Sequence, residues 1–315
     1  MGVIDSHCHL YVDRESVSPA ILDGCTALFG PNLAKLGRPM KPSAVRNHLE
    51  RECYDPDGEQ AIRKMEEAGI AQSFVVVGGF EFDPQAPEEA FERENRTISR
   101  VIGRWPGRLV GFAGIHPRVR DPLGLLRRCH EEWGMRGLKL DPLAGRYYPA
   151  DPALEPVYRY AADHGLPIVF HSGPRPEDPD SDYAHPRLIA AVLDKFPDLT
   201  VVAAHMSFRW WREFCEAARG NVRLLCDISA FQMTAALNKG QFRHVLRRVL
   251  DVVGSDRVLF GVDGPFFDMF LDRREWLSLV RTLPYDSGDG LSFREEEIGR
   301  IVEGNAGSLL ATVRD

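Results

Sequence analysis

Short apolar runs alternate with longer amphipathic stretches along most of this chain. Two of the short runs, 74–77 and 200–204, are almost continuously apolar, which favours strands of a parallel sheet covered on both faces. The pattern predicts strands at residues 3–9, 73–78, 109–116, 137–141, 168–171, 201–205, 223–228 and 258–263. It predicts helices at residues 59–68, 88–104, 123–133, 153–164 and 186–196, and a closing helix at 293–313.

The spacing of the predicted strands indicates a barrel. From the second strand onward, one strand follows the next at intervals of roughly 20 to 40 residues, the size of a βα unit. Eight units in series predict an α/β protein with a (β/α)8 TIM barrel, in a single domain over residues 1–315. A doubly wound open sheet is the competing fold, although no Gly-x-Gly-x-x-Gly motif follows the first strand. Residues 11–57 are too long for a simple connection, so we expect an insertion that covers the barrel mouth and limits substrate size.

The composition is that of an ordinary globular protein. Of the 315 residues, 44% are hydrophobic and 27% are charged, which argues against a disordered chain, a collagen or a coiled coil. The net charge of −7 argues against binding to nucleic acid or to an anionic membrane surface, since either needs a basic face. The first residues carry neither a basic stretch nor a long apolar one, so we expect a cytoplasmic protein that acts on a small molecule. The six cysteines form no Cys-x-x-Cys pair and are expected to be reduced.

Histidine and carboxylate side chains gather at the carboxyl ends of the predicted strands, where (β/α)8 enzymes carry their chemistry. His7 and His9 lie two residues apart at the end of the first strand and therefore share one face. His171 ends the fifth strand, His205 the sixth and Asp263 the eighth. A single divalent transition metal per chain is expected here, with Zn²⁺ as the first candidate and Fe, Mn, Co or Ni left open. The candidate ligands are His7, His9, His171 and Asp263.

The same positions resemble the amidohydrolase superfamily, and within it the amidohydrolase-related branch. The resemblance spans nearly the whole chain and rests on the motifs at residues 4–9, 137–140, 169–173, 204–205, 259–265 and 304–306. It implies that the four candidate ligands bind the metal and that His205 and Asp263 act as catalytic acid or base. Two departures affect the substrate side of Asp263: Val262 stands where the family usually has serine, and Gly264 is interposed before Pro265.

Lys139 lies between two leucines on an interior strand, where an ammonium group is costly to bury unless it is paired or modified. In some superfamily members the equivalent lysine carries a carbamate that bridges two metals, which would make Lys139 a further ligand. The alternatives are an ammonium group that pairs with Asp141 or Asp263, or one that binds substrate. Asp5 and Asp227 are candidates for holding the second ring nitrogen of a ligand histidine or for pairing with a basic residue.

Three hypotheses about function follow. The first is a metal-dependent hydrolase that uses a metal-activated water on a small amide, ester or lactone carrying a carboxylate. The alternative is a metal-dependent decarboxylase or hydratase of an aromatic or unsaturated carboxylic acid, which the same branch contains and the same residues would serve. The third, a barrel that binds metal or ligand without turnover, leaves His205 without a role. Products from a panel of hydroxybenzoates, lactones and amides would discriminate among them.

Basic and aromatic residues follow several strand ends and are candidates for substrate binding. Because the arginine fork matches a carboxylate, and flat side chains suit a flat ring, an anionic substrate is expected. His116 is a candidate either for substrate contact or for capping its loop. The oligomeric state, including a homodimer, stays open. The candidate substrate-binding residues are Arg118, Arg146, Arg175, Arg209, Trp210, Phe266 and His116.

Overall fold

The computed structural model describes residues 2–13, 17, 19–78, 87–175 and 182–314, and its eight parallel strands follow one another around a single sheet in chain order. The ring closes where the Ser6 N–H donates to the Phe260 carbonyl at 2.8 Å and the Asp263 N–H donates to the His7 carbonyl at 2.7 Å. This order confirms the barrel and excludes the open sheet. The strands are β1 (Val3–Cys8), β2 (Ile70–Val76), β3 (Leu109–Gly114), β4 (Gly137–Leu140), β5 (Ile168–Phe170), β6 (Val201–Ala203), β7 (Leu224–Asp227) and β8 (Val258–Leu259).

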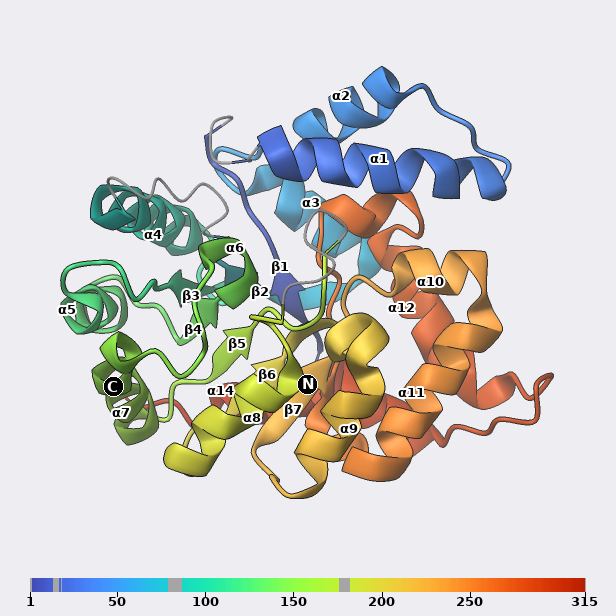
Figure 1. Cartoon of the computed structure of the whole chain (residues 1–315). Coiled ribbons are helices and arrows are strands. Elements are labelled where there is room, and N and C mark those ends of the chain that lie inside the picture. Colours follow the sequence, from blue (N-terminus) through green and yellow to red (C-terminus); the bar gives the residue numbers. More distant parts are fainter. Residues whose placement is uncertain (1, 14–16, 18, 79–86, 176–181, 315) are drawn as a thin grey trace.

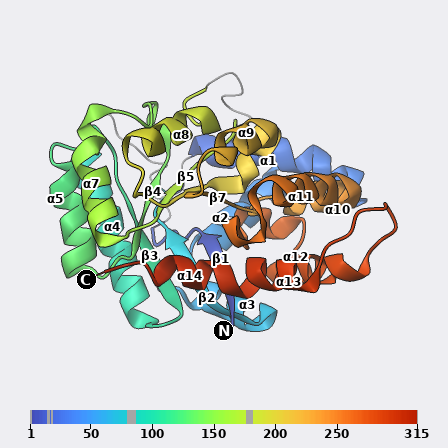
Figure 2. The ribbon, with the colours of Figure 1, turned by 90° about the horizontal axis from the view of Figure 1, so that it is seen from below.

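Helices surround the strands (Figure 1). Seen from below, α14 lies beside the strands near the N-terminus (Figure 2), and it packs on β1 and β8. The α-helices are α1 (Pro19–Lys35), α2 (Pro42–Cys53), α3 (Glu59–Ala68), α4 (Pro87–Arg104), α5 (Pro122–Arg127), α6 (Pro142–Gly145), α7 (Glu155–His164), α8 (Pro186–Lys195), α9 (Trp211–Arg219), α10 (Gln232–Leu237), α11 (Lys239–Val253), α12 (Arg273–Thr282), α13 (Glu295–Gly299) and α14 (Asn305–Leu310).

The closing segment differs from the single helix expected over 293–313. Between α13 and α14 the residues Arg300–Gly304 form a wider π-helical turn. The Ile301 carbonyl accepts a hydrogen bond from the Phe260 N–H at 3.0 Å, which ties this turn to the segment after β8. Asn305 then donates to the Ser255 and Val258 carbonyls. The amphipathic pattern identified the helical segment, and contacts to the barrel determine its interruption.

Two apolar layers support the barrel. Inward-facing side chains such as Phe74, Phe112 and Val202 fill its interior, and Ala306 and Leu309 of α14 pack against them. A larger layer lies between the strands and the surrounding helices. This arrangement follows from the near-continuous apolar runs, since a strand buried on both faces needs apolar residues at every position. No helix among the described ranges is both long and apolar enough to cross a membrane.

The insertion expected at residues 11–57 consists mainly of α1 and α2; its residues 14–16 and 18 lie outside the described part of the chain. Helix α1 packs on α2 and on α10. Phe29 of α1 contacts Phe267 and Phe270 at ring-centroid distances of 5.3 and 5.1 Å, so apolar contacts tie the insertion to the chain after β8. The α1 helix is therefore held over the carboxyl ends of the strands.

Candidate active site

Two buried histidines, one near the end of β1 and one just after it, lie beside a carboxylate from the segment after β8. His7 and His9 point to the same side, and the His9 Nε2 atom lies 3.2 Å from the Asp263 Oδ1 atom. The His7 Nε2 atom lies 3.7 Å from the same oxygen. One possible ligand atom from each of these three buried residues lies within 4.8 Å of the other two. Two imidazoles and one carboxylate at this separation match the nitrogen and oxygen ligands of divalent transition metals.

The turn after β8 brings Asp263 into this group. Its φ of 58° is left-handed, a region that aspartate tolerates better than most residues. Burial alone would raise the pKa of Asp263, but the neighbouring imidazoles of His205, His9 and His7 hold that pKa well below its ordinary value. Asp263 is therefore an anion at neutral pH, as a metal ligand must be.

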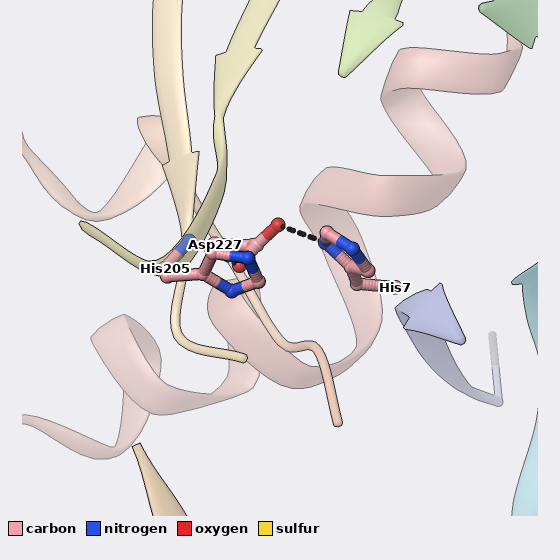
Figure 3. Close-up of side chains that lie close together, drawn as sticks. All are labelled: His7, His205 and Asp227. Atoms are coloured by element: carbon pink, nitrogen blue, oxygen red, sulfur yellow. Dashed lines mark hydrogen bonds and ion pairs between the residues drawn. The ribbon is translucent and has the colours of Figure 1, made fainter. Parts of the chain in front are cut away.

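His205 lies at the start of an unusual turn after β6. Four successive non-glycine residues from His205 to Phe208 have φ between 42° and 60°. Such conformations cost energy, and they persist only where surrounding contacts stabilise them. The His205 N–H donates to the Asp227 Oδ1 atom at 2.9 Å, and the hydroxyls of Ser172 and Ser207 are 2.7 Å apart. The turn therefore holds the His205 ring close to His7, with ring centroids 4.9 Å apart (Figure 3).

Gly173 is required by this turn, and its replacement gives a first prediction. Its φ is +113°, and an added Cβ would lie 2.7 Å from the Phe208 ring and 3.0 Å from the Ser207 carbonyl oxygen. Gly173→Ala should lower the free energy of unfolding by about 1–3 kcal/mol, measured by urea denaturation. Gly220→Ala is the matched control, because its φ is −87° and no atom lies within 4 Å of its added Cβ. Equal stabilities of the two variants would contradict this account of the turn.

His171 follows β5 and lies beside His205, with ring centroids 5.2 Å apart. Its Nε2 atom is 3.2 Å from the Gly173 carbonyl oxygen. Burial lowers the pKa of His171 well below its ordinary value, and so do Arg175 and His205 nearby. The structure thus places three of the four expected ligands in one tight group and the fourth at its edge.

Lys139 at the end of β4 is buried next to the histidine pair. Its Nζ atom lies 3.1 Å from the His7 Nε2 atom. Burial lowers the pKa of Lys139, whereas the charges of Asp141, Asp263 and Asp227 oppose that shift. Asp141 itself forms an ion pair with Arg175. Asp141, one of the two carboxylates expected to pair with Lys139, therefore has Arg175 as its ion-pair partner.

The buried imidazoles of His9 and His205 are neutral. Burial lowers the pKa of His9 to about 4 and that of His205 to about 3, although the Asp263 carboxylate opposes the shift in both cases. A neutral imidazole offers one lone pair, which is what a metal or a transferable proton requires. Protonation of His9 would therefore compete with metal binding at acidic pH.

A cavity of about 350 Å³ opens above these groups. Its lining combines charged and polar side chains with apolar ones, so the cavity suits a molecule with a charged group and a hydrophobic body. The charged and imidazole residues of the lining are His9, Lys139, His171, Arg175, His205, Arg209 and Asp263. The apolar residues include Ile21, Leu28 and Phe29 of α1 together with Phe208, Met233, Phe266 and Phe267.

Four of the seven expected substrate-binding residues do not line this cavity. His116 caps its own loop: its Nδ1 atom accepts the Arg118 N–H at 3.1 Å, and its Nε2 atom lies 3.3 Å from the Gly145 carbonyl oxygen. The exposed Arg118 side chain donates to the carbonyl of Arg146, which is also exposed. Trp210 packs against the His185 ring, with centroids 4.8 Å apart. Proximity to a strand end identified these residues, but their side chains turn to local partners instead.

Arg175, Arg209 and Phe266 do line the cavity, and the structure adds residues that the sequence analysis did not single out. Ser229 contacts the His205 ring, with 2.7 Å between its Oγ atom and the Nδ1 atom. It lies two residues after Asp227, the same spacing as His7 and His9, so the sequence did carry a signal for it. Asp227 contacts His7 Nδ1 at 2.9 Å (Figure 3), whereas Asp5 accepts hydrogen bonds from Ser73 and from backbone N–H groups.

Comparison with known proteins places this geometry in context. Residues 4–311 match the profile of a family described as Amidohydrolase. A curated relative, the 2-amino-3-carboxymuconate-6-semialdehyde decarboxylase of Dictyostelium discoideum, is 22% identical over 126 residues. That match covers 39% of this chain and only 35% of the relative, so the chain matches about a third of the length of that protein.

Solved structures share the fold over almost the whole chain. An uncharacterised TIM-barrel protein of Bordetella bronchiseptica has a TM-score of 0.70 and 23% identity, with 98% of each chain covered. A dihydroxybenzoic acid decarboxylase of Polaromonas, solved with manganese and the inhibitor 2-nitroresorcinol, has a TM-score of 0.68 and 18% identity. The match covers 98% of this chain and 97% of that one.

Proposed function

Because the chain belongs to the amidohydrolase family, we propose that it is a metal-dependent decarboxylase of an aromatic carboxylic acid, with a hydroxybenzoate-like substrate as the first candidate. The observation that carries the proposal is the lining of the cavity, in which histidines, a carboxylate and arginines are combined with many apolar side chains. Two of the three similar proteins named above are decarboxylases, and they support this alternative more than the hydrolase expected first. The proposal replaces hydrolysis with loss of CO₂ and keeps the same residues.

A divalent transition metal fits the residues present. His7, His9 and Asp263 offer buried ligand atoms in one group, and His171, which lines the same cavity as His9 and Asp263, is the fourth candidate ligand. When bound there, the ion would act as a Lewis acid that binds oxygen atoms of the substrate and stabilises negative charge. Manganese in the Polaromonas enzyme keeps Mn²⁺ beside Zn²⁺ as a candidate.

The proton that replaces CO₂ is assigned to His205. As a neutral imidazole lining the cavity, it would accept the proton of the substrate hydroxyl group and return it to the ring carbon that carries the carboxylate. The bond from that carbon to the carboxylate then breaks, its electron pair returns to the ring, and CO₂ leaves. A hydroxybenzoate anion thus gives a phenolate and CO₂, with no net change in charge or protons.

The substrate anion needs a cation among the residues that line the cavity. Arg175 forms an ion pair with Asp141, which offsets much of its charge. Arg209 lines the cavity and stacks on Trp210 at 5.6 Å from the ring centroid, so its guanidinium is held near the mouth. We assign the initial binding of the carboxylate to Arg209, because a guanidinium pairs with a carboxylate through two parallel hydrogen bonds.

Arg209→Met should therefore raise KM for aromatic acids by about 10-fold or more, since a charge-assisted hydrogen bond contributes roughly 1.5–3 kcal/mol. The value of kcat should change far less, because Arg209 has no part in the proton transfer. Arg118→Met is the matched control: it removes an exposed arginine outside the cavity and should leave KM unchanged. Equal effects of the two substitutions on KM would remove Arg209 from this role.

The experiment that tests the function is a substrate panel with metal-loaded protein. Purified chain is treated with chelator, reloaded separately with Mn²⁺ or Zn²⁺, and offered hydroxybenzoates, lactones and amides of matched size. We expect CO₂ release from at least one hydroxylated aromatic acid, only with metal present. Acid release from a lactone or amide, with no CO₂ from any aromatic acid, would instead support the hydrolase hypothesis.

A further inference from the structure

One buried carboxylate contacts two histidines that have different roles in the proposed mechanism. The Asp227 Oδ2 atom lies 2.9 Å from His7 Nδ1 (Figure 3). The Oδ1 atom accepts the backbone N–H groups of His205 at 2.9 Å and Ser229 at 3.0 Å, and also the Ser229 hydroxyl. The Ser229 Oγ atom in turn lies 2.7 Å from His205 Nδ1. A chain of short contacts thus runs from His7 through Asp227 and Ser229 to His205.

The direction of each hydrogen bond follows from which of the contacting atoms carry a proton. The Asp227 Oδ1 atom accepts three hydrogen bonds and the Oδ2 atom faces the His7 ring, so the carboxylate acts only as an acceptor. His7 must therefore donate from Nδ1. The Ser229 proton is committed to Asp227, so the Ser229 oxygen must accept from the Nδ1–H of His205. The neutral His205 ring is then left with a lone pair on Nε2, and in His7 the Nε2 atom is the nitrogen that faces Asp263 and the candidate metal site.

A separate contact points to the same tautomer of His7. The Lys139 Nζ atom lies 3.1 Å from the His7 Nε2 atom. The lysine Nζ atom carries N–H donors, so it can donate to a lone pair on Nε2. Lys139 and Asp227 lie against opposite nitrogens of one ring, and a proton on Nδ1 suits both contacts.

We propose that Asp227 is a shared positioning residue, which fixes the His7 tautomer directly and the His205 tautomer through Ser229, so that both rings offer an Nε2 lone pair. In His7 that lone pair serves a metal ion, and in His205 it serves as the proton acceptor. Ser229 is then a positioning residue that affects proton transfer but not metal binding. The catalytic meaning rests on the proposed function, whereas the tautomers themselves do not.

The tautomers are measured directly by ¹⁵N NMR of histidine-labelled protein, prepared without metal and assigned with single His→Asn variants. The expected spectrum of the wild type at neutral pH shows a protonated Nδ1 for both His7 and His205, and an unprotonated Nε2 for His205. An unprotonated Nδ1 in either ring, or a protonated Nε2 in His205, would overturn the proposal. This result does not depend on turnover, so it stands even if no aromatic acid is a substrate.

Substitutions at Ser229 and at Asp227 separate the contact of Asp227 with His205, which runs through Ser229, from its direct contact with His7. Ser229→Ala should lower kcat by about 10–100-fold, with KM and metal content unchanged, and should mix the His205 tautomers in the NMR spectrum. Ser229→Thr keeps the hydroxyl and should restore both the wild-type kcat and the single His205 tautomer. Asp227→Asn should weaken metal affinity by about 10–100-fold, measured by competition with a chromophoric chelator. The reason is that an amide has one acceptor oxygen and cannot accept hydrogen bonds both from His7 and from the His205 and Ser229 N–H groups.

The matched control is Ser99→Ala, which removes a hydroxyl that donates to the Trp133 carbonyl on the outer helices. It should leave the His205 spectrum and metal affinity unchanged. If Ser229→Ala behaves as this control does in the NMR spectrum, Ser229 has no positioning role. If Asp227→Asn folds and binds metal as tightly as the wild type, the branch through His7 is wrong.

Discussion

Replacing both His7 and His9 with alanine should abolish metal binding and activity together. The two imidazoles and Asp263 form the tight group of buried ligand atoms, so the double variant leaves only Asp263 and His171 of the four candidate ligands. Two nitrogen ligands removed from a site of four leave too few to hold a divalent transition metal against water. Elemental analysis of chelator-free protein should give about one metal per wild-type chain and none per variant chain.

The control for this experiment is His244→Ala, which removes an exposed histidine on α11. Its metal content and turnover should equal those of the wild type. A double variant that keeps stoichiometric metal, with a circular dichroism spectrum like that of the wild type, would contradict the ligand assignment. A double variant that loses metal but retains full turnover would show that catalysis needs no ion.

Replacing His205 with asparagine should leave the metal in place and lower kcat by about 10²–10⁴-fold, the usual contribution of general acid–base catalysis. Asparagine is chosen because the residue has a φ of 60°, and asparagine adopts that left-handed region more readily than other non-glycine residues. The substitution therefore removes the imidazole without adding backbone strain. Steady-state kinetics and metal analysis on one preparation give both quantities.

His185→Asn is the matched control for this second prediction. The His185 side chain caps the N-terminus of α8 by accepting the Arg187 N–H, a role that asparagine fills well. The kcat of this variant should stay within about twofold of the wild type, because the substitution does not touch the contacts that join His7, Asp227, Ser229 and His205. A compatible cap should also leave stability within about ±0.5 kcal/mol. If His205→Asn also retained nearly full kcat, the ring carbon would have to receive its proton from another group.

The fold was predictable because its pattern is local. Each strand is a short apolar run, and each terminal polar residue marks a strand end, so the eight-unit barrel could be inferred from one sequence and is confirmed. The position of His7 beside Asp263 follows from the closure of β1 on the segment after β8. Strand ends were less predictable: β5 and β6 each stop at three residues, just before His171 and Ala204.

The direction of loop side chains could not be predicted in the same way. Arg118 and Arg209 both follow strand ends closely, yet only Arg209 reaches the cavity. The difference arises from tertiary contacts: Arg118 finds the Arg146 carbonyl, whereas the left-handed turn after β6 carries Arg209 toward the mouth. A run of four positive φ values in non-glycine residues has no sequence signature, because it depends on Asp227 and Gly173 from other segments.

The measurement that tests the central claim most directly is turnover of a carboxyl-¹³C-labelled hydroxybenzoate by metal-loaded protein in D₂O. The account predicts one ¹³CO₂ released per phenol formed, and one deuterium at the ring carbon that lost the carboxylate, because His205 delivers an exchangeable proton there. Release of ¹³CO₂ that continues unchanged after removal of the metal, or a product without deuterium at that carbon, would contradict it.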